Sequence, residues 1–282
     1  MRKAEVITEL DENGACGQFI RVAEADCQHC GLRPSALFAD LGSAELGQVS
    51  KEICSGVLRR GSVIYSTGDP GASVFTVRVG LVKLVMEIPG REERIVRLLG
   101  RGATLGLEVL AGRPYDHTAT TLRTTSLCRI ATPTVESLHE RNPRLLNGLM
   151  AKWHEQVMWA DRWIAVLGSG AMPQRLANLV RLLVDIGGDP LDAVNLPSIA
   201  DIAAILGASQ EAVSRHLAEF KRTGLLTHVA PRTYRCDPAA ILAMANGGTS
   251  RPFGTNGRAS AGTLGIAGAP WGPAPSACGL HP

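Results

Sequence analysis

The chain has 282 residues, more than one hydrophobic core usually covers, so two domains are expected. Its 45% hydrophobic and 20% charged residues are typical of a globular protein, and its net charge of +3 is informative only through its distribution. The sequence contains no apolar run of about 18 residues, so no membrane span is predicted. Its start is charged, so no signal peptide is predicted either. We therefore expect a cytoplasmic protein without a membrane partner, in which the seven cysteines are thiols or ligands.

Residues 1–40 form a polar segment that carries Cys16, Cys27 and Cys30. The texture changes over residues 41–140, where short β-branched runs such as "SVFTVRVG", "LVKLVMEI" and "RIVRLL" alternate with glycine- and proline-rich turns. Many short strands at this spacing are typical of an antiparallel barrel or roll. An α+β protein with an N-terminal antiparallel β-roll is therefore expected.

A helix of about six turns is predicted over residues 141–168, opened by Asn142-Pro143 and closed by Gly168. Gln156 lies within a line of residues at a 3-4-3-4 spacing, which is the pattern of one coiled-coil seam. The other members of this seam are Leu146, Leu149, Trp153, Ala160, Trp163 and Leu167. The pattern favours a homodimer, and the alternative is a helix that packs on its own domain.

Residues 169–246 read as a DNA-binding domain that begins with a helix around "PQRLANLVRLLVDIG". Ser198 can then cap a short helix whose apolar face holds Ile199, Ile202, Ala203 and Leu206, with Gly207 at its end. Ser209 can cap a second helix, with Val213, Leu217, Phe220 and Leu225 facing inward. Two helices joined by a glycine-containing turn predict a helix-turn-helix.

The outward residues at the start of the second helix are Gln210, Glu211, Ser214 and Arg215, the positions that meet base edges in the major groove. Arginine can hold guanine, and glutamate can accept from the amino group of cytosine. The side chains expected at phosphates are Ser198, Ser209, Lys221, Arg222 and Arg232, with Arg235 nearby. "LLTHVAPRTYRC" predicts a hairpin, or wing, with Pro231 at its turn. The alternative is an ordinary surface helix pair with solvated charges.

Residues 247–282 hold nine Gly and five Pro without Asp or Glu, so we expect a disordered tail.

A β-roll, a long helix and a winged helix-turn-helix in this order resemble the CRP/FNR family of bacterial transcription regulators. The resemblance covers residues 27–245 and is carried by "GSVIYSTGDPGASVFTVRVGLVKL" and "DIAAILGASQEAVSRHLAEFKRTGLL". The E-x-x-S-R pattern at Glu211, Ser214 and Arg215 resembles the FNR branch. That resemblance implies binding to double-stranded DNA at TTGAT-type inverted repeats, activation through RNA polymerase, and control of oxygen- or redox-responsive genes.

The stretch "LGLEVLAGRPYDHTATT" departs from the cyclic-nucleotide-binding members of that family. Those members place an arginine before Ser or Thr to hold the cyclic phosphate, whereas His117 precedes Thr118 here. A neutral histidine is a poor replacement for a bidentate phosphate clamp, so no cAMP response is expected.

Resemblance to the oxygen sensors of the family implies a [4Fe–4S] cluster held by Cys27, Cys30 and Cys128. The family's remaining cysteine follows the pair after five or seven further residues, where this chain has Ala36 and Phe38. Cys16 is then the candidate fourth ligand, and Cys54 is expected to pack in a helix-like stretch. Three interpretations stay open: a cluster, a thiol–disulfide or other metal site, and no site. Cys128 is also expected on a strand face that points into the roll.

An enzyme is the rival class. The seven histidines are scattered, and the chain has no H-E-x-x-H, P-loop or G-x-S-x-G motif. The prediction is therefore a regulator and not an enzyme.

Overall fold

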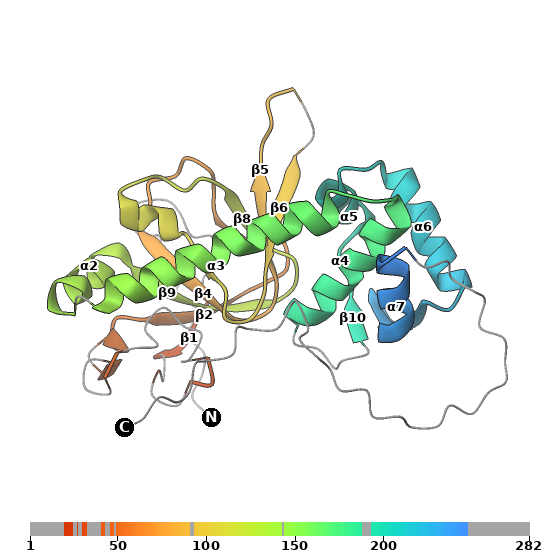
Figure 1. Cartoon of the computed structure of the whole chain (residues 1–282). Helices are drawn as coiled ribbons and strands as arrows, with labels where there is room; N and C mark the ends of the chain where they lie inside the picture. Colours follow the sequence, from red (N-terminus) through yellow and green to blue (C-terminus); the bar gives the residue numbers. More distant parts are fainter. Residues whose placement is uncertain are drawn as a thin grey trace, which may run out of the picture. The chain divides into compact units, whose positions relative to one another are not determined.

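The computed structural model describes residues 20–24, 27, 30–32, 41–42, 46–47, 49–90, 93–142, 144–187 and 193–247 (Figure 1). Contacts divide the chain into two units. One is Met1–Gly170 with Pro197–Val213, and the other is Ala171–Leu196 with Ser214–Pro282. No helix within the described ranges is long and apolar enough to cross a membrane. Cys16 and most of the glycine-rich tail lie outside these ranges.

Two antiparallel sheets form the roll of the first unit. The larger has the order β1-β2-β9-β4-β7, with β1 at Ile20–Glu24, β2 at Cys54–Leu58, β9 at Thr125–Ala131, β4 at Ser73–Val79 and β7 at Thr104–Leu105. The smaller has the order β3-β8-β5-β6, with β3 at Val63–Tyr65, β8 at Thr118–Thr121, β5 at Val82–Met86 and β6 at Arg94–Leu99. The predicted antiparallel roll is confirmed, and β1 adds to it an edge strand from the N-terminal segment.

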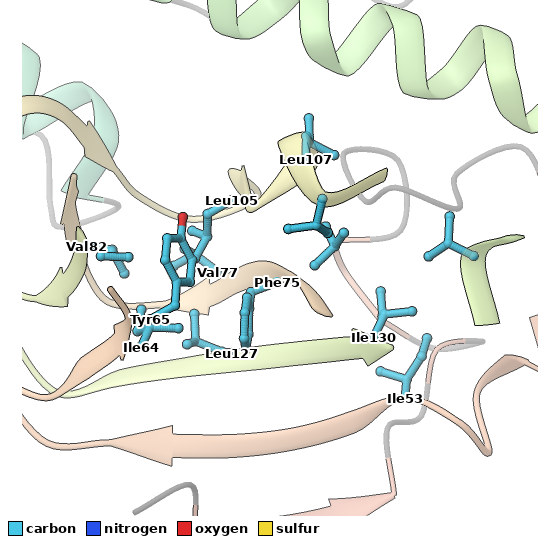
Figure 2. Close-up of a cluster of buried hydrophobic side chains, with 14 of the residues drawn as sticks. Ile53, Ile64, Tyr65, Phe75, Val77, Val82, Leu105, Leu107, Leu127 and Ile130 are labelled. Atoms are coloured by element: carbon cyan, nitrogen blue, oxygen red, sulfur yellow. The ribbon is translucent and has the colours of Figure 1, made fainter. Parts of the chain in front are cut away.

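The core of the roll is largely aliphatic because the chain has few aromatic residues, 4% in all. Val74, Val77 and Leu127 are fully buried, and Figure 2 shows Leu127 beside Phe75 and Tyr65. Burying each such side chain contributes about 1.5–3 kcal/mol. Cys54 begins strand β2. The expected helix-like setting for Cys54 is therefore wrong, because "CSGVL" alternates as a sheet strand that pairs with both β1 and β9.

Helices follow the roll. Helix α2 covers Thr132–Arg141 and α3 covers Arg144–Leu167, whereas a short 3-10 helix, η2 at Leu107–Ala111, lies within the roll between β7 and β8. The predicted long helix is confirmed as α3, which runs along the roll in Figure 1. The inward side of α3 begins with Leu145, which is buried in the roll core, and Leu149, which packs against it.

The remaining elements belong to the predicted DNA-binding region. They are α4 at Met172–Gly187, β10 at Ala193–Asn195, α5 at Ile199–Leu206, α6 at Gln210–Arg222, β11 at Leu226–Ala230, β12 at Thr233–Cys236 and α7 at Pro238–Ala245. The strand order is β10-β12-β11, so the predicted wing hairpin is confirmed as β11 and β12. By contacts, α5 and the first turn of α6 group with the roll.

Candidate nucleic-acid interface

Helix α5 begins with a capping box. The Ser198 hydroxyl accepts from the backbone N–H of Asp201 at 3.0 Å, and the Asp201 carboxylate accepts from the Ser198 backbone N–H. The Ser198 hydroxyl also donates to that carboxylate, so its single donor hydrogen is used within the cap. Asp201 therefore competes with DNA phosphate for the Ser198 hydroxyl.

The opposite end of α5 needs glycine. Gly207 has φ 58, in the left-handed region, and caps the helix through its N–H to the carbonyl of Ala203. A Cβ at this position would overlap with the guanidinium of Arg94. Of the predicted apolar face, Ile202, Ala203 and Leu206 are buried, while Ile199 is 40% exposed. Ile205, which was not predicted to face inward, is also buried.

Helix α6 is capped as predicted, with the backbone N–H of Ala212 donating to the Ser209 hydroxyl at 3.2 Å. All four predicted inward residues are buried, namely Val213, Leu217, Phe220 and Leu225. All four predicted base-contact residues are exposed, namely Gln210, Glu211, Ser214 and Arg215. These four residues lie on the first two turns of the helix. Because they are exposed, their side chains do not pack against the domain.

Glu211 is held in its anionic form. Its own backbone N–H, and then the Ser209 hydroxyl, keep the pKa of this exposed carboxyl below its usual value. An ionised carboxylate can only accept hydrogen bonds, and the amino group of cytosine is the base-edge donor that suits it.

Basic residues continue beyond the recognition turn. Lys221 lies over the ring of Tyr234, with its Nζ 4.9 Å from the ring centroid, and His228 meets the same ring edge-on. Arg222 is exposed and lies 3.9 Å from Glu219, and Arg232 is exposed at the wing turn with φ 63. Tyr234 thus connects the end of α6 with the wing, and the cationic ends stay accessible for phosphates.

Three of the predicted cysteine ligands lie near one another. Burial raises the pKa of the Cys128 thiol to about 11; Arg78 lowers it, while Cys27 and Cys30 raise it further. Cys128 is half-buried and packs against the roll core, and Ile130 on the same predicted face is buried, so the expected inward face for Cys128 is confirmed. Within the described ranges, no three His, Cys, Asp or Glu side chains are spaced to hold a metal ion.

A polar cluster occupies the roll near the position predicted to lack a phosphate clamp. Burial lowers the pKa of His117, and Arg97 lowers it further while Glu108 and Asp116 raise it, so His117 is neutral at pH 7. Arg97 of β6 interacts with Glu108 as well. Arg97 was missed in the sequence, because "RIVRLL" reads as a strand and carries no signal for which distant residues its arginines meet.

The apolar seam predicted for α3 divides between two faces. Leu149 packs against the roll core, and Leu167 is 3% exposed. The protomer itself covers Leu167, so that predicted seam position is wrong, whereas Leu149 is half-buried and its place in the seam stays a prediction. Ala160 and Trp163 are half-buried. The exposed stripe consists of Leu146, Met150, Trp153, Val157 and Ile164.

A capped helix pair with an exposed polar recognition turn, followed by a basic wing and preceded by a β-roll, defines a DNA-binding transcription regulator. The cyclic nucleotide-binding domain family matches residues 56–142, and the Crp-like helix-turn-helix domain family matches residues 174–244. The chain belongs to the CRP/FNR family of transcription regulators and is not an enzyme.

Curated relatives agree with this assignment. The chain is 27% identical over 229 residues to the transcriptional activator protein Anr of Pseudomonas aeruginosa, covering 79% of this chain and 94% of Anr. It is 24% identical over 205 residues to the fumarate and nitrate reduction regulatory protein of Escherichia coli K12, covering 71% and 82%.

Solved structures share the fold. FixK2 from Bradyrhizobium japonicum has a TM-score of 0.61 at 21% identity, covering 68% of this chain and 96% of FixK2. A CRP family regulator from Thermus thermophilus has a TM-score of 0.59 at 23% identity, covering 70% and 99%.

Proposed function

We propose that this regulator binds TTGAT-type inverted repeats in promoters and controls oxygen- or redox-responsive genes from the cytoplasm, as an activator that contacts RNA polymerase. The exposed turn of α6 carries the proposal, because it offers Glu211, Ser214 and Arg215 on one accessible surface. Arginine suits the O6 and N7 acceptors of guanine, and ionised Glu211 suits the amino group of cytosine.

The proposed DNA-binding form is a homodimer, as an inverted repeat requires two copies of one reading helix. The exposed stripe of α3 supports it, because Leu146, Met150, Trp153 and Val157 follow a 4-3-4 spacing that reaches Ile164 one heptad after Val157. The five large apolar side chains of this stripe, left in water, are costly for a monomer, and Met158 of the same helix is also exposed. A second copy of α3 would cover them.

The proposed oxygen- or redox-responsive site is the thiol group made by Cys27, Cys30 and Cys128. Cys27 and Cys30 lie close enough to raise the pKa of Cys128, which supports a common site, and thiolates are the ligands that iron–sulfur clusters take. A [4Fe–4S] cluster would be held by these three thiols with Cys16 as the fourth, and it would supply reactivity toward oxygen. The described thiols would have to approach one another further and lose their protons to hold it.

A regulator without a cluster is the second candidate. Burial raises the pKa of the Cys128 thiol to about 11, so iron would displace its proton less readily than that of an ordinary thiol, and this favours that candidate. Such a regulator would be controlled by its abundance or by another effector. Under either candidate we propose no response to cAMP, because His117 is neutral and cannot act as a bidentate clamp.

The central test is a gel-shift titration of Arg215→Ala on a duplex with a TTGAT-type inverted repeat. A bidentate arginine–guanine contact contributes roughly 1–3 kcal/mol of discrimination, so affinity should fall roughly 5- to 150-fold. Changing the guanine of each half-site should weaken the wild type and leave Arg215→Ala unaffected.

Two further variants make this test specific. Arg113→Ala removes an exposed arginine of the roll and should bind like the wild type. Arg222→Ala should weaken binding to all sequences equally and reduce its dependence on salt. Wild-type affinity in Arg215→Ala would refute the base contact.

A further inference from the structure

Gln156 joins α3 to the roll through both ends of its amide. Nη1 of Arg97 donates to its Oε1 at 2.8 Å, and its Nε2 donates to the backbone carbonyl of Thr104 at 2.9 Å. Arg97 lies on β6 and Thr104 on β7, so one side chain connects the helix with strands of both sheets. A donor and an acceptor used in opposite directions fix the position and the rotation of the amide.

The groups around this contact are buried and polar. Burial lowers the pKa of Arg97, whereas Glu108 and Tyr65 raise it. Within the described part of the chain, the Tyr65 hydroxyl and Oγ1 of Thr104 are buried without a hydrogen-bond partner of normal geometry, although the Gly106 backbone acts on the pKa of Tyr65. Without its amide partner the half-buried Arg97 would lose a hydrogen-bond acceptor and would keep only its interactions with Glu108 and Tyr65.

Gln156 also lies next to the exposed apolar stripe on α3. It is half-buried, and the exposed Trp153 and Val157 of the apolar stripe are its near neighbours. Each residue of an α-helix turns the direction of a side chain by about 100°. A small rotation of α3 would break both hydrogen bonds and move the apolar stripe by the same angle. The clamp formed by Arg97, Gln156 and Thr104 therefore fixes which face of α3 is presented.

We propose that Gln156 is a positioning residue for DNA binding. Through the clamp it sets the rotation of α3 on the roll, and so the geometry in which a second copy pairs and the two recognition helices meet DNA. Changes in the roll that move Arg97 would be passed to α3 by the same contact. This inference rests on the proposed homodimeric DNA-binding function.

The test uses the full chain and four variants: Gln156→Leu, Arg97→Met, the double variant and Gln156→Glu. Sedimentation equilibrium gives the dimer Kd, and fluorescence anisotropy on the inverted repeat gives DNA affinity. Gln156→Leu should weaken DNA binding by about tenfold or more, within the range of typical coupling between sites. The double variant should bind DNA no more weakly than the more affected single variant, because both substitutions remove the same interaction. Gln156→Glu keeps the acceptor for Arg97 but loses the donor to Thr104, so it should recover part of the affinity.

Asn147→Leu is the matched control. It makes an amide-to-leucine change at an exposed position of α3 that lies nine residues from Gln156, and so on the opposite side of the helix. It should leave DNA affinity unchanged. Wild-type DNA affinity in Gln156→Leu, or additive losses in the double variant, would overturn the clamp. If Gln156→Leu unfolds, wild-type affinity in Gln156→Glu overturns it instead. Loss in Arg215→Ala alongside wild-type affinity in Gln156→Leu would reject the clamp and leave the proposed function standing.

Discussion

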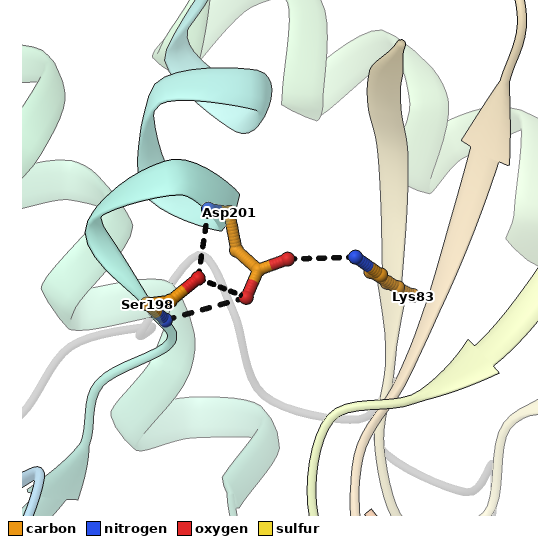
Figure 3. A network of polar contacts seen from close by, with 3 residues as sticks. All are labelled: Lys83, Ser198 and Asp201. Carbon is orange, nitrogen blue, oxygen red and sulfur yellow. Dashed lines mark hydrogen bonds and ion pairs between the residues drawn. The ribbon is translucent and has the colours of Figure 1, made fainter. Parts of the chain in front are cut away.

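Asp201 combines two duties in one carboxylate. It closes the capping box of α5, and it accepts from the Lys83 ammonium of β5 at 2.7 Å (Figure 3). The side chains are 22% exposed for Lys83 and 13% for Asp201, so the pair is largely shielded from water. Burial alone would raise the pKa of Asp201, but the hydrogen bonds from Lys83 and Ser198 outweigh it and the pKa is lowered.

Lys83→Met should destabilise the chain by about 1–3 kcal/mol at pH 7, because it leaves a shielded carboxylate without its charged donor. A carboxyl whose pKa is lowered in the folded state adds stability above its unfolded pKa, and that stability is lost as the pH falls through the lowered value. The deficit of Lys83→Met should therefore shrink below about pH 4. Urea unfolding at pH 7 and at pH 3 measures both values.

Lys152→Met is the control for this ion pair. Lys152 pairs with Glu155, which is 58% exposed, and such pairs contribute about 0–1 kcal/mol. A deficit for Lys83→Met that is equal at both pH values would contradict the assigned role of Asp201.

At the residue scale, the sequence pattern predicted those side-chain positions that depend only on their own helix or strand. The outward residues of α6 follow from its period and its cap, so Glu211 and Arg215 were found. Arg97 and Gln156 were not linked by the sequence analysis. They are distant in the chain, and no local spacing records which strand and helix face will meet.

Among the elements, α3 shows how a correct helix can be given a partly wrong face. The 3-4-3-4 reading placed Leu167 in one seam with Leu146 and Trp153. A long amphipathic helix that packs on its own domain and on a partner carries two apolar stripes, and hydrophobicity alone does not separate them. Burial separates them, because Leu167 is 3% exposed while Leu146 is 48% exposed.

Met150→Asp should weaken the proposed dimer. Met150 is 62% exposed within the stripe, and desolvating a new carboxylate there costs several kcal/mol. The dimer Kd should rise by at least about a hundredfold in sedimentation equilibrium, with little change in thermal stability at monomeric concentration. Met86→Asp makes the same change at a roll residue that is 41% exposed and should not alter the Kd. An unchanged Kd in Met150→Asp would exclude this stripe as the interface.

The other elements also differ in whether local sequence or pairing with distant residues determines their structure. The roll strands and the helix-turn-helix were predictable from alternation, turns and caps. Strand β1 was missed, because "IRVAE" alternates over too few residues to stand out and is a strand through pairing with β2. Helix α7 was missed too, although Asp237 caps it and Pro238 opens it.

For the whole molecule, we predict that loss of the proposed iron–sulfur cluster weakens DNA binding. Protein purified without oxygen should contain about four iron and four sulfide per subunit and absorb near 400 nm, and air should remove both and weaken DNA binding. Cys27→Ser and Cys30→Ser should lack iron from the start. Iron, sulfide and DNA affinity are measured on the same samples before and after exposure to air.

Variants at other cysteines complete this experiment. Cys16→Ser should also lose the cluster, and Cys54→Ser should keep it, if Cys16 is the fourth ligand. Cys278→Ser serves as the thiol-to-hydroxyl control. A colourless, iron-free protein that binds DNA equally in air and without oxygen would select the regulator without a cluster.

The sheet order β1-β2-β9 also determines when the thiol site can exist during synthesis. Strand β2 pairs with β9 through Cys54 and Arg129, which are far apart in the chain. On the ribosome, the segment with Cys27 and Cys30 therefore emerges long before Cys128 and the strand that places it. Pairings of such large sequence separation form slowly. In the proposed site, Cys27 and Cys30 would be made before Cys128 is in place, and oxidation at that stage would compete with completion of the roll.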